Sequence, residues 1–522
     1  MNRTDPDELE AAAAQAMASG EYMAALRLLD RIIGLGNPSA SVWLKTGNGL
    51  LAVREFAQAI GAFANAVAID SQLVEAHHNL ARAYYTLGEL DRATPHLWQT
   101  VKLTDQIDPW LALATVLPNA PNASHDQVLG ARREFAKRLA EASQVSAVKR
   151  PARSKRIASE PIRVAYLSAH FAGRNYMKPV WALVNHHDRR RIHVHLLCDK
   201  ESPTQFAGYQ RHANDTIHDV SKLDDVSLAS LLEQLQIDVL VDLSAFSYTS
   251  RLSLFTRPLA PVTIAWFNMY ATSGLPAFDH IIGDRHVIWP AEEQYYSETV
   301  LRLPLSYLTF EVDYPVPDVA PTPCLSRQQF TFGSLVSQYK ITEPTCAAWS
   351  EMLTRCPMSR LILANTELKS PHNRDYVIQR FVDNGVAREQ IVCLPPTDHD
   401  KFLRYYDQID LALDSFPYSG GTTTMEALWQ GVPVLTHDGD RWAARTSKTL
   451  LEEGGLTQFV ARDAQHYVDL AVDYASQTSQ WKVLAELRQN MRSQLSQSSA
   501  CNGQGLATAM ESLYADVLER AV

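Results

Sequence analysis

The chain has 522 residues, of which 46% are hydrophobic and 20% are charged. This length predicts two to four domains, and the composition is that of a globular protein rather than a disordered one. The formal net charge of −10 gives no electrostatic reason to expect nucleic-acid binding.

The ends and the cysteines of the chain point to a cytoplasmic protein. The polar N-terminus predicts no signal peptide, and no apolar run approaches the roughly 18 residues needed to span a bilayer. The six cysteines show no CxxC spacing, which argues against a zinc site or a disulfide framework and fits a reducing compartment. The basic stretch 149–156 is interpreted as a solvated linker rather than a nucleic-acid or membrane patch.

From residue 6 to about residue 104 the sequence repeats itself with a period of about 34 residues, which is typical of tetratricopeptide repeats. The positions in register are Ala13, Gly47 and Ala81; Ala25, Ala59 and Ala93; and Leu29, Phe63 and Leu97. Small residues let two helices approach closely, and the large ones fill the neighbouring grooves. We therefore expect about three such repeats in residues 1–110; a generic amphipathic helical domain is the alternative. Their concave face would bind a peptide or protein, or mediate self-association.

The next segment, 111–160, is expected to be a helical linker with one helix from about Gln127 to Ala142. From residue 161 onwards, short apolar runs rich in β-branched residues alternate with helical segments. The expected strands are 162–168, 193–197, 238–243, 262–266, 361–364, 391–394, 409–414 and 432–436. This alternation predicts mostly parallel sheets covered by helices on both faces. We expect two Rossmann-like domains, 161–318 and 319–522, with the break near a cluster of four prolines between Pro315 and Arg327. Their ligand would lie in the cleft between them.

The segment from Asp414 to Pro433 carries the clearest binding pattern. A strand ends at Asp414, two glycines (Gly420 and Gly421) follow, and threonines open a helix. The exposed N–H groups and partial positive charge of a helix N-terminus suit a phosphate, to which the hydroxyls of Thr422 and Thr423 can add hydrogen bonds. Glu426, one turn into that helix, is placed for ribose hydroxyls. An ordinary strand–helix connection with a threonine cap is the alternative.

A second pattern places Lys340 just beyond the end of a strand, within the segment 333–342. A lysine there can stabilise a departing diphosphate, as a divalent metal does in other transferases. Ser337 and Gln338 of the same segment are expected to help bind the donor molecule that carries this diphosphate. So is Arg445, at the end of a loop (439–445) that could face an anion.

These segments together resemble the catalytic region of the O-GlcNAc transferase family, glycosyltransferase family 41, including its plant SPINDLY-type and bacterial members. The resemblance covers residues 162–520, and its matching motifs include 163–168, 257–262, 272–274, 339–341 and 414–433. It implies a GT-B fold behind tetratricopeptide repeats and an inverting transfer from a nucleotide sugar without metal or cofactor. It also implies that Lys340 stabilises the diphosphate, that Gly421, Thr422 and Thr423 contact phosphate, and that Glu426 binds ribose.

The chain departs from this family mainly in the half that should face the sugar and the acceptor, with one further change in the phosphate loop. His170 replaces a usual acidic residue, Arg174 stands where the family tends to carry histidine, and Gly421 replaces the phosphate-loop histidine of the animal enzymes. An inverting transfer needs a base for the acceptor, and His170 is the first candidate because a histidine titrates near neutrality. Asp242 is the second, and a structural role for His170 is equally open.

We therefore expect a protein O-glycosyltransferase that moves GlcNAc from UDP-GlcNAc to serine or threonine of a protein docked by the repeats. O-fucosylation from GDP-fucose is the closest alternative, and transfer of another sugar, including to asparagine, on flagellin or an adhesin is also open. A repeat scaffold with a weakened catalytic part is the alternative from another class. No nucleic acid, membrane span or metal is expected, whereas association of identical chains is compatible with the repeats.

Overall fold

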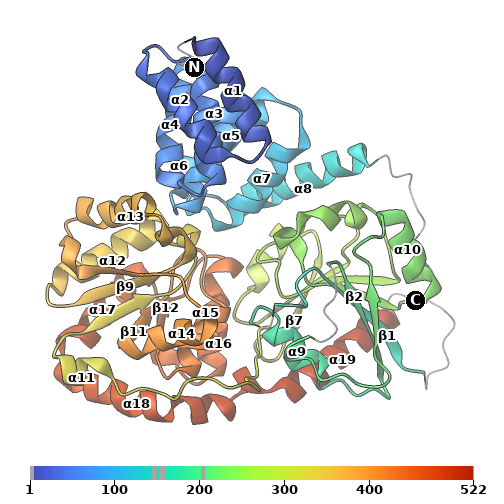
Figure 1. The fold of residues 1–522 in the computed structure, drawn as a ribbon. Helices are drawn as coiled ribbons and strands as arrows, with labels where there is room; N and C mark the ends of the chain where they lie inside the picture. Colours follow the sequence, from blue (N-terminus) through green and yellow to red (C-terminus); the bar gives the residue numbers. More distant parts are fainter. Residues whose placement is uncertain (1–4, 144–149, 152–159, 174, 201–205, 521–522) are drawn as a thin grey trace.

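The computed structural model of the chain describes residues 5–143, 150–151, 160–173, 175–200 and 206–520. A helical module lies above two domains built on parallel sheets, which stand side by side (Figure 1). Most of the predicted basic linker lies outside the described residues. Its Arg150 forms an ion pair of 2.7 Å with Asp279.

The repeats are three helix pairs, as the period predicts. Their helices are α1 (Pro6–Ala18), α2 (Tyr22–Gly34), α3 (Ala40–Ala52), α4 (Phe56–Ile69), α5 (Val74–Thr86) and α6 (Leu90–Leu103). Ala25, Ala59 and Ala93 are fully buried at the helix crossings. At Gly47 a Cβ atom would lie 2.4 Å from the ring of Phe63, so this position has no room for a side chain. The small and large positions of the period therefore pack as tetratricopeptide repeats require.

The linker is helical as expected and continues the stack towards the first sheet. It contains α7 (Ile107–Val116), the short 3-10 helix η1 (Leu117–Asn119) and α8 (His125–Ala142). Helix α8 begins two residues before the predicted start because Ser124 caps it: its hydroxyl accepts from the Gln127 backbone at 3.2 Å. The Gln127 side chain in turn accepts from the Ser124 N–H at 2.9 Å, completing a capping box.

The first α/β domain, the N-terminal half, carries a seven-stranded parallel sheet in the order β3-β2-β1-β4-β5-β6-β7. Its strands are β1 (Ile162–Ser168), β2 (Ile192–Cys198), β3 (Thr216–Asp219), β4 (Val239–Asp242), β5 (Val262–Ala265), β6 (His280–Asp284) and β7 (Thr299–Leu303). Its helices are α9 (Lys178–Val184) and α10 (Asp225–Gln234). The strands β1 and β4 are neighbours, so the loops that follow Ser168 and Asp242 leave the sheet at the same edge.

The second domain, the C-terminal half, has a six-stranded sheet in the order β10-β9-β8-β11-β12-β13. Its strands are β8 (Thr331–Ser334), β9 (Arg360–Ala364), β10 (Ile391–Leu394), β11 (Leu411–Leu413), β12 (Val434–His437) and β13 (Val460–Ala461). Its helices are α11 (Pro323–Arg327), α12 (Glu343–Arg355), α13 (Pro371–Asp383), α14 (His399–Arg404), α15 (Thr422–Trp429), α16 (Thr446–Glu453), α17 (Ala464–Ser476) and α18 (Thr478–Ser496). Two Rossmann-like domains behind a repeat module form the expected GT-B architecture.

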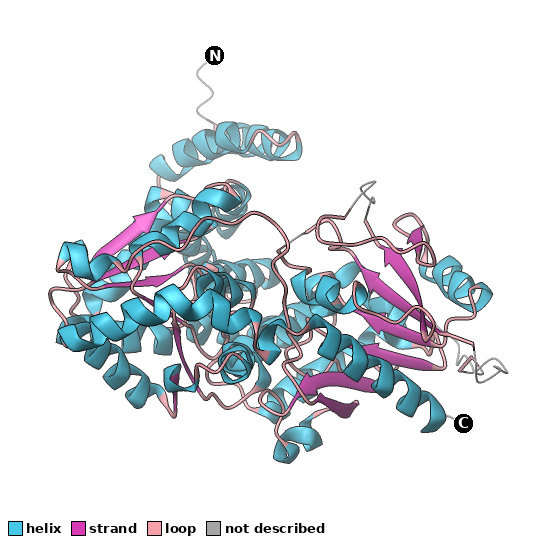
Figure 2. Cartoon of the chain, turned by 90° about the horizontal axis from the view of Figure 1, so that it is seen from below, coloured by secondary structure: helices cyan, strands magenta, loops and turns pink. Residues whose placement is uncertain are grey.

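The C-terminal boundary differs from the prediction. The last helix, α19 (Gly503–Arg520), leaves the C-terminal half and packs under the sheet of the N-terminal half (Figures 1 and 2). The Tyr514 hydroxyl lies 3.1 Å from that of Tyr166, and the Glu511 carboxylate lies 3.1 Å from the ring of His187. The N-terminal half is therefore discontinuous in sequence, because α19 completes its hydrophobic core.

The repeats are fixed on the C-terminal half by backbone contacts. Gly88, in a left-handed conformation, lies so close that a Cβ atom there would be 2.3 Å from the Ile341 carbonyl. The Arg380 guanidinium donates to the carbonyls of Leu87 at 2.8 Å and Ile341 at 3.1 Å. The Asp91 N–H donates to Glu343 at 3.0 Å. The module is thus held against the segment that contains Lys340.

Candidate active site

The loop between β11 and α15 is shaped by the buried carboxylate of Asp414. One of its oxygens accepts the Gly420 N–H at 2.6 Å, and the other accepts the Thr436 hydroxyl at 2.7 Å. Burial raises the pKa of Asp414, while these two hydrogen bonds and nearby Lys340 lower it. The carboxylate holds the glycine loop across the carboxyl end of the sheet, where ligands of parallel α/β sheets bind.

The start of α15 offers hydrogen-bond donors for an anion. Thr422 and Thr423 are the first two residues of this helix and are half-buried, and neither hydroxyl bonds to another protein atom among the described residues. A Cβ atom at Gly420 would meet the Thr424 hydroxyl at 2.5 Å, whereas at Gly421 its nearest neighbour would be 3.5 Å away. The loop therefore requires glycine at 420 but has room for a side chain at 421. The free N–H groups and hydroxyls of the first turn can hold a phosphate.

Lys340 lies directly beside this loop. It ends the short 3-10 helix η5 (Gln338–Lys340), and its ammonium donates to the Ser419 carbonyl at 2.8 Å. The same ammonium lies 3.9 Å from the centre of the Tyr418 ring. Burial lowers the pKa of Lys340 to about 8, although the charge of Asp414 raises it. The structure thus brings Lys340 together with the loop of Gly420 and Gly421, as the two separate sequence patterns require.

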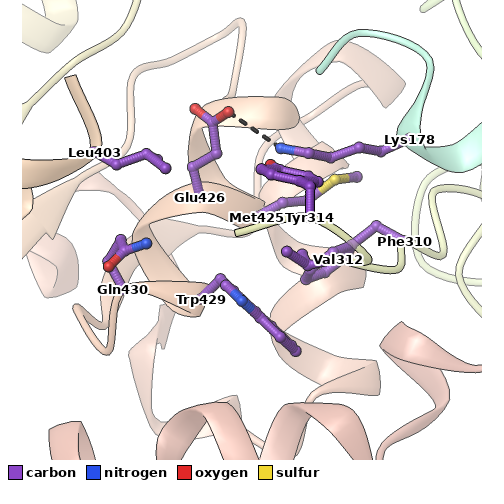
Figure 3. A pocket seen from close by; sticks show the side chains of 9 residues that line it. All are labelled: Lys178, Phe310, Val312, Tyr314, Leu403, Met425, Glu426, Trp429 and Gln430. Atoms are coloured by element: carbon purple, nitrogen blue, oxygen red, sulfur yellow. Dashed lines mark hydrogen bonds and ion pairs between the residues drawn. The ribbon is translucent and has the colours of Figure 1, made fainter. Parts of the chain in front are cut away.

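Glu426 is buried in the cleft and already has a partner. Its carboxylate lies 3.1 Å from the ammonium of Lys178, and both side chains are buried, with exposures of 5% and 4%. Figure 3 shows these two groups pointing towards each other in the pocket, close to Tyr314. The ring of His399 lies 3.6 Å from the same carboxylate oxygen. A ribose that binds Glu426 must therefore share it with Lys178, which comes from the N-terminal half.

The two candidate bases lie at neighbouring strand ends but differ in their surroundings. His170 is half-buried, and its Nε2 atom lies 3.3 Å from the Ser247 hydroxyl. Burial and the charge of Lys200 lower the pKa of His170, so the ring is neutral at neutral pH and can accept a proton. Asp242 is 2% exposed, and its oxygens accept two backbone N–H groups that follow it, at 3.2 and 2.9 Å. Asp242 therefore holds the turn after β4, and burial raises the pKa of its carboxyl to about 6.

Two predicted donor-binding residues, Arg445 and Gln338, are placed otherwise than expected, and no observation contradicts the prediction for a third, Ser337. Arg445 is fully buried, and its guanidinium donates two hydrogen bonds of 2.9 and 2.8 Å to Glu292 of the N-terminal half. Arg445 therefore joins the two halves instead of facing an anion. Gln338 is also fully buried, and its amide donates to the Leu87 carbonyl of the repeats at 3.4 Å. Ser337 is exposed, and its carbonyl accepts the Lys340 N–H. Arg445 and Gln338 have structural partners because charged and polar groups buried in a protein need them.

Several site residues were missed at the sequence level. Lys178, Tyr418 and Asp414 all contact predicted residues, and Asn268 donates to the Ser247 hydroxyl at 2.6 Å beside His170. Lys178 carried a recoverable signal, because a lysine within the apolar run 177–184 has to find a buried partner. Arg174, noted as a departure from the family, lies outside the described residues.

The described residues contain neither a metal-binding cluster nor a membrane-spanning helix. None of these residues forms a group of three or more histidines, cysteines, aspartates or glutamates suited to hold a metal ion. None of the helices in the described ranges is long and apolar enough to cross a bilayer.

Comparisons with known proteins agree on one family. The sequence model of "Glycosyl transferase family 41" matches residues 134–315 and 324–510. The chain is 30% identical over 404 residues to "Probable UDP-N-acetylglucosamine--peptide N-acetylglucosaminyltransferase SPINDLY" of Hordeum vulgare, covering 76% of this chain and 42% of the relative. The relative of the same name in Arabidopsis thaliana is 30% identical over 370 residues, covering 69% of this chain and 40% of the relative.

A solved structure extends this likeness to the whole fold. The structure of a point mutant of the Thermobaculum terrenum O-GlcNAc transferase superposes with a TM-score of 0.79 at 26% identity and covers 100% of both chains. The chain spans about two fifths of the length of the curated plant relatives it matches. Since the family model matches well over half of its residues, this chain belongs to glycosyl transferase family 41.

Proposed function

We propose that this protein is an inverting protein O-glycosyltransferase that moves GlcNAc from UDP-GlcNAc to a serine or threonine hydroxyl, without a metal or cofactor. The names of the two plant relatives and of the solved bacterial structure support this donor and this class of acceptor. The single observation that carries the proposal is the position of the Lys340 ammonium, 2.8 Å from the Ser419 carbonyl, at the mouth of the α15 loop.

The proposed chemistry follows from this arrangement. The donor diphosphate binds the first turn of α15, where the N–H groups and the Thr422 and Thr423 hydroxyls donate to its oxygens. The acceptor hydroxyl attacks C1 of the sugar as the bond to the diphosphate breaks, and its proton passes to His170, whose lowered pKa leaves the ring neutral. The Lys340 ammonium offsets the charge that develops on the leaving diphosphate. Lys340 and His170 thus act on opposite sides of the reacting carbon.

The acceptor is proposed to be a protein that contacts both the repeats and the catalytic halves. The repeats are held rigidly beside η5 by Gly88 and Arg380, so a polypeptide bound along them would reach the mouth of the cleft. The proposed site of action is the cytoplasm, where thiols stay reduced, and the six cysteines form no disulfide with one another.

Thermal denaturation in the presence of nucleotides tests the donor. A ligand that binds only the folded protein at a hundred times its Kd stabilises it by about 2.7 kcal/mol. We expect UDP and UDP-GlcNAc to raise Tm, and GDP and GDP-fucose to leave it unchanged. Stabilisation by the guanine nucleotides alone would replace the proposal with O-fucosylation. No response to any nucleotide would favour a scaffold without transferase activity.

A further inference from the structure

A cavity of about 150 Å³ lies where the repeats, the helical linker and both catalytic halves meet. Its walls include Arg132, Ser247 and four tyrosines, which are Tyr85, Tyr270, Tyr339 and Tyr418. Ser247 is exposed and the four tyrosines are only partly buried, so the cavity reaches the molecular surface. Its volume would hold a side chain or a small group rather than a whole nucleotide sugar.

The cavity borders both groups of the proposed chemistry. On one side Tyr418 forms its wall, and the same ring lies 3.9 Å from the Lys340 ammonium. On the other side Ser247 forms its wall, and the Ser247 hydroxyl lies 3.3 Å from His170. Tyr339 and Tyr418 are its two wall residues from the C-terminal half, which carries the phosphate loop. The cavity therefore lies mainly on the acceptor side of the reacting carbon.

The walls of the cavity include a buried cation. Arg132 of α8 is 2% exposed, and its guanidinium donates to the backbone carbonyls of Ala114 at 2.6 Å and Thr272 at 3.2 Å. It also lies 3.4 Å from the centre of the Phe246 ring. Among the described residues, no carboxylate forms an ion pair with Arg132 at 4.0 Å or less. The carboxylate whose charge acts on Arg132 is that of Glu298, which accepts the Thr272 hydroxyl at 2.8 Å.

A guanidinium in this position is costly unless an anion completes its surroundings. Burial removes the water that solvates the guanidinium charge. Hydrogen bonds to backbone carbonyls recover part of the lost solvation free energy, whereas a directly bound carboxylate recovers far more of it. Burial lowers the pKa of Arg132 to about 9, although the charge of Glu298 raises it. A planar guanidinium beside aromatic walls is well suited to a carboxylate, which it can bind through two parallel hydrogen bonds.

We propose that this cavity is an acceptor subsite that takes an aspartate or glutamate side chain of the acceptor polypeptide, with its carboxylate paired to Arg132. The inference rests on the proposed transfer to a protein. It adds that the modified serine or threonine has an acidic neighbour. The tyrosine rings pack against the aliphatic part of that neighbour, and the exposed rim at Ser247 places its backbone near His170.

A peptide series tests the subsite with the full chain and UDP-GlcNAc. Each peptide carries one central serine and a single glutamate at one flanking position, and its matched partner carries glutamine there. We expect at least one position at which glutamate raises kcat/KM about tenfold over glutamine, because a buried charge-assisted pair is worth that much. Equal kcat/KM for every matched pair would overturn the inference, whatever happens in the variants.

Variants then assign the preference to Arg132. Arg132→Gln should remove the preference for glutamate while leaving the KM for UDP-GlcNAc and the rate on glutamine peptides unchanged, and Arg132→Lys should keep part of it. Arg133→Gln removes an exposed charge from the same helix and should change nothing. A preference that persists in Arg132→Gln overturns the assignment. An enzyme that neither binds nor hydrolyses UDP-GlcNAc would instead contradict the proposed function, which separates the two failures.

Discussion

The buried ion pair between Lys178 and Glu426 leads to a prediction about stability. The two charged atoms are 3.1 Å apart, and the side chains are 4% and 5% exposed. Removing one partner leaves the other charge buried, which typically costs about 3–5 kcal/mol. For Lys178→Met we expect the lower end, because the ring of His399, 3.6 Å away, can then turn to donate an N–H to the Glu426 carboxylate. For Glu426→Met we expect the upper end, because among the described residues the ammonium then keeps only the face of the Tyr314 ring, at 5.4 Å.

Urea unfolding followed by tryptophan fluorescence measures this effect. The double variant should be less destabilised than the sum of the two single variants by about 2 kcal/mol or more, since each single change already removes the interaction. Lys401→Met is the matched control. Its ammonium pairs with Asp398 at 2.9 Å but is 70% exposed, so the expected loss is below about 1 kcal/mol. Single variants as stable as this control, or strictly additive losses, would refute the idea that the pair ties the two halves together.

Three further predictions concern the catalytic groups. Lys340→Met should lower kcat by about 100-fold or more with an unchanged Tm, measured by release of UDP; near-normal kcat would remove Lys340 from the mechanism. Gly420→Ala should abolish stabilisation by UDP because the new methyl group would lie 2.5 Å from Thr424, whereas Gly421→Ala should retain it; equal behaviour of the two would contradict the loop geometry. The acid limb of kcat/KM should lie below the ordinary histidine pKa of 6.5 and vanish in His170→Gln, because His170 has a lowered pKa and must be neutral to accept a proton. The basic limb of kcat/KM should lie near pH 8, where Lys340 of the free enzyme loses its charge. In the pH profile of kcat this limb should move to higher pH, because the bound diphosphate favours the charged lysine. If the acid limb persists in His170→Gln or the basic limb in Lys340→Met, other groups titrate in these pH ranges.

Local patterns predicted the fold well. The repeat period locates all six helices of the repeats. The apolar runs locate eight strands with errors of a few residues, and the segment before Lys340 locates a ninth, β8. The short strands β3, β6, β7 and β13 were missed because their residues are too few or too polar to stand out from loops. The docking of α19 was missed for another reason. Its amphipathic pattern shows that one face is buried but does not identify the sheet that covers it.

The site was predictable where one continuous segment builds it. The loop before α15 and the lysine at 340 follow from strand ends, glycines and a helix start, which are local features. Arg445 and Gln338 could not be placed, because their partners, Glu292 and Leu87, are distant in sequence. The same holds for Lys178, whose carboxylate partner lies in the other half of the chain. Long-range partners decide whether a polar side chain binds a ligand or another part of the protein.

Mass spectrometry of an acceptor incubated with this enzyme tests the central claim most directly. A serine-containing peptide library is incubated with UDP-GlcNAc or GDP-fucose, with the wild-type chain and with Lys340→Met. We predict addition of a single N-acetylhexosamine to serine or threonine from UDP-GlcNAc by the wild type alone. Transfer of fucose from GDP-fucose, transfer to asparagine, or equal transfer by Lys340→Met would contradict it.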